Sequence, residues 1–310
     1  MQVLSRTNET AIKIAALLAL LFWGFATQAQ GTGNADYSVS GYNHRIDKSH
    51  APASINLMDG VNLEARPTPL QNELNSPYDD IKPHLAPDGN RLYFSRNFHP
   101  GNVNGENDPE DIWYSDFDAS SDTWSEPMHM TGVLNNAGPN YVNNVSVTGD
   151  TIILGNQYLK KGKMRAGLSY SVKVNGEWSI PVAINIVNDY NMSNHAGSHV
   201  SLKDGVIIRS VQRAESIGER DLFVSFWDGE KATEPINMGS VINTEFEESS
   251  PFLASDNKTL YFASKGHNGH GGFDIFVTHR LDDTWTNWTT PENLGPGVNG
   301  SLDDEFFSIT

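Results

Sequence analysis

The chain has 310 residues, of which 38% are hydrophobic and 19% charged, so it can build a sizeable core and is not a disordered polyelectrolyte. Its 38 acidic and 21 basic residues leave a net charge of -17. The basic residues form no stripe that would neutralise phosphates, which argues against nucleic acid as a partner. No cysteine is present, which excludes disulfides, thiolate metal sites and cysteine nucleophiles.

Residues 1–29 have the features of a secretory signal peptide. Two basic residues precede an apolar run from Ile14 to Ala26, and the small residues Thr27 and Ala29 precede an expected cleavage site. The run is shorter than the roughly 20 residues of a membrane-spanning helix. We therefore expect export to the periplasm or the cell exterior, with no transmembrane segment after cleavage. An uncleaved membrane anchor is the alternative.

The mature chain divides into a lead-in and a set of repeats. Residues 30–75 contain several prolines and no strong periodicity, and we expect one strand there, near residues 55–58. From residue 76 the chain repeats itself. Residues 78–95 align without a gap with residues 246–263, an offset of 168, which is three times 56. A repeat of this length predicts a propeller or a solenoid.

Two weaker copies lie between these, with apolar centres at 151–154 and 205–208, and a fifth copy begins at Leu302. We therefore expect a propeller from residue 76 to residue 310. Four complete copies and the start of a fifth leave the ring of blades unclosed. Either the sequence is truncated, or the lead-in supplies strands that close a fifth blade. We favour five blades, with six as an alternative.

Each copy predicts four strands. In the last complete copy, short β-prone segments fall at 251–254, 260–264, 274–277 and 285–290, separated by turn and glycine-rich segments. The middle strands are apolar on both faces, as expected where each sheet lies between two others. No apolar residues recur with helical spacing over a helix length. The fold class is therefore all-β, a β-propeller of four-stranded blades.

Aromatic and acidic residues recur at fixed places in the copies, and we expect structural roles for them. Trp124, Trp178 and Trp288 each begin a closing segment that ends in proline three residues later, and should fill the wedge between blades. An aspartate opens each third strand and should accept hydrogen bonds from backbone amides at a tight turn. These aspartates are Asp111, Asp221 and Asp274.

Three motifs carry a resemblance to a known family. The pattern of residues 83–95, the glycine-rich loop with residues 271–276 and the closing segment 288–295 resemble TolB-like, WD-type (PD40) propeller repeats. Such repeats occur next to OmpA-like domains in Bacteroidetes envelope proteins. The resemblance covers residues 76–310 and implies the propeller fold. It does not imply an activity, because propellers host binding modules, hydrolases and lyases.

Paired acids offer the best candidate site. They precede the expected inner strands of three blades, where they could converge on the axial funnel. A hydrolase needs two carboxylates about 5–9.5 Å apart, and the same acids could instead satisfy turn amides. The candidate binding residues are Asp79, Asp80, Glu247, Glu248, Asp303 and Asp304.

Metal sites have weaker support. The loop from Asn102 to Asp111 carries oxygen ligands suited to calcium but lacks the 12-residue calcium-loop pattern. The histidine pairs His195/His199 and His267/His270 do not share a face on strands as they would on a helix. We expect no cofactor, with calcium as a possibility at the acidic loop.

The sequence thus favours a secreted, non-enzymatic binding or scaffold propeller of the cell envelope. Its partner would be an envelope protein or a glycan, contacted through the rim or the axial funnel. The alternative is a carbohydrate-active enzyme, a glycoside hydrolase or lyase, that uses the acidic residues of the funnel.

Overall fold

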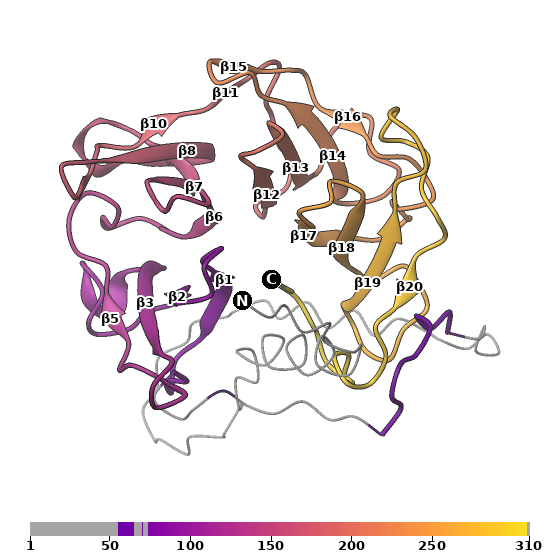
Figure 1. Cartoon of the computed structure of the whole chain (residues 1–310). Helices are drawn as coiled ribbons and strands as arrows, with labels where there is room; N and C mark the ends of the chain where they lie inside the picture. Colours follow the sequence, from indigo (N-terminus) through magenta and orange to yellow (C-terminus); the bar gives the residue numbers. More distant parts are fainter. Residues whose placement is uncertain (1–54, 65–69, 71–73, 309–310) are drawn as a thin grey trace, which may run out of the picture.

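The computed structural model describes residues 55–64, 70 and 74–308, which form an all-β propeller arrangement of four blades around a centre (Figure 1). The first blade contains β1 (Asp80–Leu85), β2 (Arg91–Arg96), β3 (Asp111–Asp118), β4 (Thr123–Trp124) and β5 (Met128–His129). The second contains β6 (Val142–Val145), β7 (Thr151–Tyr158), β8 (Met164–Val174), β9 (Glu177–Trp178) and β10 (Val182–Ala183).

The other two blades have four strands each, as expected. The third contains β12 (Gly197–Ser201), β13 (Val206–Val211), β14 (Asp221–Phe226) and β16 (Ile236–Asn237). The fourth contains β17 (Glu248–Leu253), β18 (Thr259–Ser264), β19 (Asp274–His279) and β20 (Glu292–Asn293). The remaining elements are η1 (Gly105–Asn107), η2 (Lys160–Gly162) and the parallel pair β11 (Asn185–Ile186) and β15 (Lys231–Ala232).

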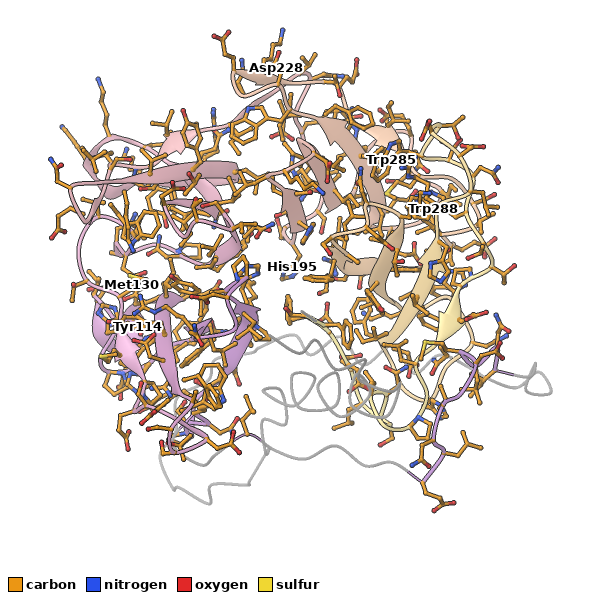
Figure 2. All side chains as sticks on the ribbon, in the orientation of Figure 1. Tyr114, Met130, His195, Asp228, Trp285 and Trp288 are labelled. Carbon is orange, nitrogen blue, oxygen red and sulfur yellow. The ribbon has the colours of Figure 1, made fainter. Side chains whose placement is uncertain are left out.

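The core lies between neighbouring blades. All six residues of β13 are buried, so both faces of this strand are covered. Trp285 and Trp288 pack into one apolar cluster with residues of the third and fourth blades, such as Leu222 and Phe276 (Figure 2). Trp178 packs against the cluster between the first two blades. The expected packing role of the closing tryptophans between blades is thus seen at Trp288, which is buried, and at Trp178, which is half-buried. Full burial of a large apolar side chain contributes about 1.5–3 kcal/mol.

The innermost strands carry a bulge at one repeated position. The pairing of β1 with β2 shifts between Ile81 and His84, and that of β17 with β18 shifts at the equivalent place. Lys82 and Ser250, 168 residues apart, have φ angles of 53° and 46°. A proline follows each of them, and prolines inside sheets are confined to edges and bulges. The bulge turns extra side chains of the inner strand toward the centre.

The third strands are held by a repeated hydrogen-bond pattern. As expected, Asp111, Asp221 and Asp274 accept from the amides of Val103, Ile217 and Gly271 at 2.6, 2.7 and 3.0 Å. In these three blades, an asparagine from the segment after the blade then bonds both backbone groups of the residue that follows the aspartate. Asn243 accepts from Leu222 N at 2.8 Å and donates to Leu222 O at 3.0 Å. Asn135 and Asn299 do the same for Ile112 and Ile275.

The number of blades differs from the expectation. Four blades form in the described residues, so the five or six blades that we expected are not shown. Residues 302–308 contain no strand, although Phe307 packs against Tyr261 of the fourth blade. In the lead-in, Leu57 forms a parallel bridge with Asn293 of β20. The segment around Leu57 therefore extends the outer edge of the fourth blade, whereas Leu70 and Leu74 pack against the first blade.

Two expectations fall outside what the structure describes. The signal peptide, residues 1–29, lies wholly in the residues that are not described, as do residues 30–54 of the lead-in. Across the described ranges, no helix has the length and apolar character that a bilayer crossing requires.

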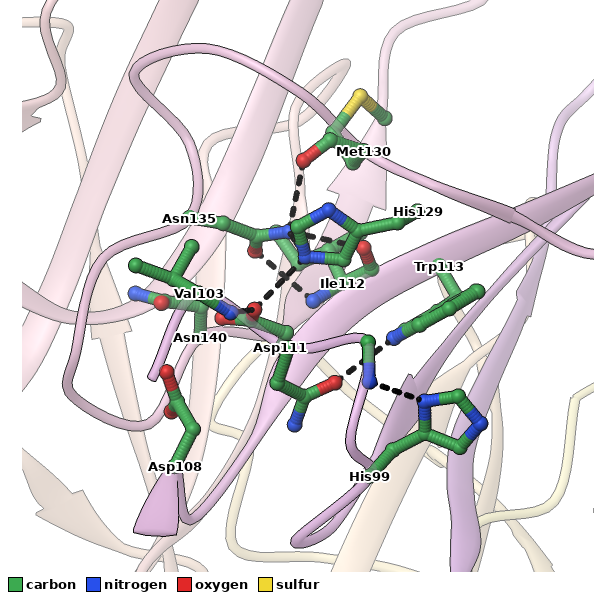
Figure 3. Close-up of polar contacts among 12 residues, drawn as sticks. His99, Val103, Asp108, Asp111, Ile112, Trp113, His129, Met130, Asn135 and Asn140 are labelled. Atoms are coloured by element: carbon green, nitrogen blue, oxygen red, sulfur yellow. Dashed lines mark hydrogen bonds and ion pairs between the residues drawn. The ribbon is translucent and has the colours of Figure 1, made fainter. Parts of the chain in front are cut away.

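One member of the third-strand pattern is exceptional, because a histidine takes the place of an amide (Figure 3). His129 Nε2 lies 2.7 Å from Oδ2 of the fully buried Asp111. At the equivalent position of the third blade, Asn237 donates to Asp221 at 2.7 Å. The pair in the first blade therefore does the same structural work with an imidazole.

We predict that His129→Asn changes the free energy of unfolding by less than about 1 kcal/mol, because Asn237 makes the same hydrogen bond in the third blade. Asp111→Ala should cost about 2–4 kcal/mol, because it leaves the Val103 amide and the His129 ring without their partner. Urea unfolding of both variants measures this. Equal stability of Asp111→Ala and the wild type would contradict the structural role.

Candidate active site

A cavity opens at the axis of the propeller, where the inner strands meet. Its volume is about 60 Å³, and because one water occupies roughly 10–15 Å³ on this scale, it holds several water molecules. Its lining comes from the first strands or the segments just before them in all four blades, and from residues 306–308. The polar and aromatic lining residues on which the chemistry depends are Lys82, His84, Tyr141, His199, Ser250 and Phe252.

Register explains why these side chains converge. His84 pairs with Tyr93 one step before the last pair of its ladder. Phe252 pairs with Tyr261 at the same step of its ladder. His199 pairs with Ile208, which holds the same place in its second strand as Tyr93 and Tyr261 do in theirs. The three residues therefore occupy equivalent positions in the first, third and fourth blades. The ring centroids of His199 and Phe252 lie 5.1 Å apart in an edge-to-face arrangement.

Both cavity histidines are neutral at physiological pH. Burial lowers the pKa of His84 to about 4. Burial also lowers the pKa of His199, with the charge of His84 as a second cause, to about 3. Nε2 of His84 is buried and has no hydrogen-bond partner among the described residues. A buried polar atom without a partner is costly and unusual, so this nitrogen is a ready contact for a bound ligand.

One ion pair lies at the wall of the cavity. Lys82 Nζ contacts both carboxylate oxygens of the buried Glu110 at 2.6 and 2.7 Å. The same Nζ lies 3.9 Å from the centre of the Tyr141 ring, which lines the cavity. Burial raises the pKa of Tyr141, although the charge of Lys82 opposes this. The Lys82 side chain thus brings a positive charge to the cavity with its counter-ion behind it.

A carboxyl group lies beside the cavity on the terminal segment. Ser250 Oγ, which lines the cavity, donates to Glu305 Oε1 at 3.3 Å, and Glu305 directly precedes the lining residue Phe306. Burial raises the pKa of Glu305, against the hydrogen bonds from Ser249 and Ser250. The group therefore holds its proton to a higher pH than an ordinary glutamate and can act as a proton donor.

The six predicted acids are not brought together in this cavity. The second member of each pair accepts a hydrogen bond from the amide four residues earlier: Asp80 from Ser76 at 2.6 Å, Glu248 from Thr244 at 2.9 Å, and Asp304 from Gly300 at 2.7 Å. Asp80 also pairs with Arg96 at 2.7 Å. These three acids therefore accept hydrogen bonds from turn amides, which was the structural alternative to a binding role.

The first members of the pairs diverge. Glu247 pairs with Arg220 at 3.0 Å and Lys265 at 2.8 Å, and Asp303 accepts from Phe273 N at 2.9 Å. Asp79 is exposed. None of the six lines the axial cavity of the described structure. Their role in ligand binding stays a prediction.

The metal candidates are placed as follows. His199 lines the cavity, whereas His195 is exposed. His267 Nε2 contacts the carbonyl of Ile242 at 2.9 Å. In the acidic loop, Asn102 receives the Trp113 indole N–H at 3.0 Å, and Asp108 receives the Asn104 amide at 3.0 Å. Within the ranges that the structure describes, no three potential ligands gather around one point. Calcium at this loop stays a prediction.

The sequence analysis missed the cavity residues, although the repeats carried a signal. His84 aligns with Phe252 at an inner-strand position where an apolar residue is expected. His84 is instead polar, and it follows Pro83 at the bulge of β1. His199 gave no comparable signal, because the third copy is too weak to align without the structure.

Comparison with known proteins gives solved structures only. No protein-family model matches the chain, and no curated protein sequence does either. The periplasmic gluconolactonase PpgL of Pseudomonas aeruginosa is 11% identical, with a TM-score of 0.42 over 70% of this chain and 58% of that one. A TolB-like protein of Agrobacterium tumefaciens is 15% identical, with a TM-score of 0.38 over 67% and 64%. The chain thus spans less than two thirds of each.

An α-L-arabinofuranosidase of Lactobacillus brevis is 11% identical, with a TM-score of 0.42 over 68% of this chain and 73% of that one. The neighbours include a TolB-like protein, as the sequence motifs indicated, whereas the PD40 repeat family and the OmpA-like context are not shown. The chain is thus an all-β protein with a four-blade propeller arrangement.

The expected non-enzymatic scaffold is contradicted. The similar structures are mainly glycoside hydrolases, among them xylosidases and arabinofuranosidases, together with the gluconolactonase. The sequence analysis tied an enzymatic function only to the paired acids, three of which cap turns, and did not recognise the polar groups that meet at the axis. The likeness assigns no substrate and no residue role to this chain.

The pH dependence of stability provides a test of the burial of the turn-capping carboxyl group of Glu248. Burial raises its pKa from 4.5 to about 7, so the folded protein keeps this proton where the unfolded chain releases it. The resulting stabilisation is present below pH 4.5 and is lost as the pH rises through 7. We predict that the free energy of unfolding of the wild type falls by about 3 kcal/mol between pH 4.5 and pH 8 because of this group, and that Glu248→Gln abolishes this part of the fall. Urea unfolding at both pH values measures it. A parallel decline in variant and wild type would contradict this.

Proposed function

We propose that the chain is a carbohydrate-active enzyme that breaks a glycosidic bond at the axial cavity. One observation carries the proposal: a neutral histidine with an unpartnered Nε2 lines the cavity, and a buried glutamate with a raised pKa bonds the lining residue Ser250. These are His84 and Glu305. The first can accept a proton and the second can donate one, which is the arrangement that general acid–base catalysis requires.

The shape and lining of the cavity support a sugar as the ligand. Phe252, Phe306 and Tyr141 provide aromatic surface, against which the apolar face of a sugar ring can lie. Asn143 and Ser198, which bond each other at 2.9 Å, and the histidines supply hydrogen-bond partners for hydroxyl groups. A volume of about 60 Å³ suits one terminal sugar unit better than the middle of a polymer.

The proposed chemistry follows from the opposite directions of the two pKa shifts, lowered at His84 and raised at Glu305. Glu305 protonates the glycosidic oxygen as its bond to carbon breaks, and His84 accepts a proton from either a water molecule or the sugar itself. The first route is hydrolysis and the second is elimination. Hydrolysis ordinarily uses two carboxylates. Near this cavity the second one is Glu110, and both of its oxygens already contact Lys82.

We also propose a location and a closed ring. The support for export to the periplasm or cell surface is the apolar run from Ile14 to Ala26. The support for a fifth blade, of the PD40 type, is that Phe306 has a φ of 61°, like Lys82 and Ser250. Asp304 also repeats the turn bond of Glu248. Residues 302–308 would then begin a fifth inner strand.

The experiment is a turnover assay of the full chain against a panel of neutral and acidic oligosaccharides, with release of new sugar ends as the readout. We expect Glu305→Gln and His84→Asn each to lower kcat/KM by about 100-fold or more. Glu126→Gln, at an exposed acid outside the cavity, should leave it unchanged. Thermal melting confirms that the variants are folded.

Product release from no member of the panel would overturn the proposed function. Activity that survives both cavity substitutions would place the reaction elsewhere in the molecule.

A further inference from the structure

We propose that the axial cavity selects an acidic sugar, a uronate, and that the bond breaks by elimination with His84 as the base. This inference rests on the proposed function and names its substrate class. It starts from the charges that face the cavity. In the described part of the chain, every titratable group that lines the cavity is a base or a tyrosine, and no carboxylate is among them. The lining groups in question are Lys82, His84, Tyr141 and His199.

This lining contrasts with the rest of the molecule. The whole chain carries a net charge of -17. A cavity lined without carboxylates is therefore an exception to the acidic character of the chain. The nearest acids are held by partners: Glu110 pairs with Lys82, and Glu305, whose pKa burial raises, accepts from Ser250. Arg209, on the strand behind Ser198, pairs with Asp189. A carboxylate ligand therefore meets no other carboxylate among the described groups that line the cavity.

The histidines are suited to an anionic ligand. In the empty cavity, burial holds the pKa of His84 at about 4, which is too low for an efficient base at neutral pH. A carboxylate within a few ångströms favours the charged imidazolium and raises that pKa. His199 responds in the same way. Binding of the uronate thus brings the base toward its working range, which a neutral sugar does not do.

The elimination step balances without a further reactant. Nε2 of His84 takes the proton from the ring carbon that carries the carboxylate, whose acidity the carboxylate and the Lys82 charge increase. The C–H electron pair becomes a carbon–carbon double bond, and the bond from the adjacent carbon to the glycosidic oxygen breaks. Glu305 gives its proton to that oxygen. The reaction needs no second carboxylate, which agrees with the lining.

The test is calorimetric binding of glucuronate and galacturonate against glucose and galactose, at pH 6 and pH 8, in two buffers of different ionisation enthalpy. We expect the uronates to bind at least tenfold more tightly than the neutral sugars, more tightly at pH 6 than at pH 8, and with net proton uptake. His84→Asn and His199→Asn should each reduce the uptake. His195→Asn, at an exposed histidine of the preceding loop, is the matched control and should not change it.

The outcomes separate this inference from the proposed function. Equal or tighter binding of neutral sugars would overturn the uronate assignment while the enzyme proposal stands. Turnover of a uronate oligosaccharide without an ultraviolet-absorbing unsaturated product would overturn the elimination step. Failure to bind any of the four sugars, together with no turnover in the panel, would overturn both the inference and the proposed function.

Discussion

The structure depends on one repeated set of hydrogen bonds at the start of the third strand, present in the first, third and fourth blades. A buried aspartate closes the loop before the strand, and an asparagine from the segment after the blade bonds both backbone groups of the next residue, as Asn243 does for Leu222. Buried backbone groups need partners, so this segment has few other conformations. It leads directly into the inner strand of the next blade. These contacts therefore position β6, β17 and residues 302–308, each of which contributes residues to the axial cavity.

The axial cavity is a consequence of that placement and of the bulge. Inner strands are edge strands, and their prolines and left-handed residues, such as Lys82 and Ser250, would weaken a central strand. At the axis they direct polar side chains into a space too narrow for bulk water. Desolvation there keeps His84 and His199 neutral and helps Glu305 to keep its proton. The same burial that forms the core thus sets the chemistry of the site.

Much of the fold could be predicted from the sequence, and little of the site. The strand pattern and the aspartate turns are local signals that can be recognised within a single repeat, and the 56-residue spacing follows from comparing repeats. The cavity is assembled from single residues of different blades, and its key members, His84 and His199, lie 115 positions apart. The paired acids attracted attention because they are adjacent in sequence, yet Glu248 and its equivalents cap turns. The side chains that converge at the axis share a register, and that register becomes visible only when the strands are paired.

The most direct test of the account is the protonation of the two cavity histidines, followed by NMR of labelled imidazoles from pH 4 to pH 8, with and without a uronate. The account predicts that His84 and His199 stay neutral above about pH 5 in the free protein, since burial holds their pKa values at about 4 and 3. It also predicts that both pKa values rise when the uronate binds. Ordinary titration near pH 6.5 in the free protein, or no response to any sugar, would contradict a desolvated ligand site at the axis.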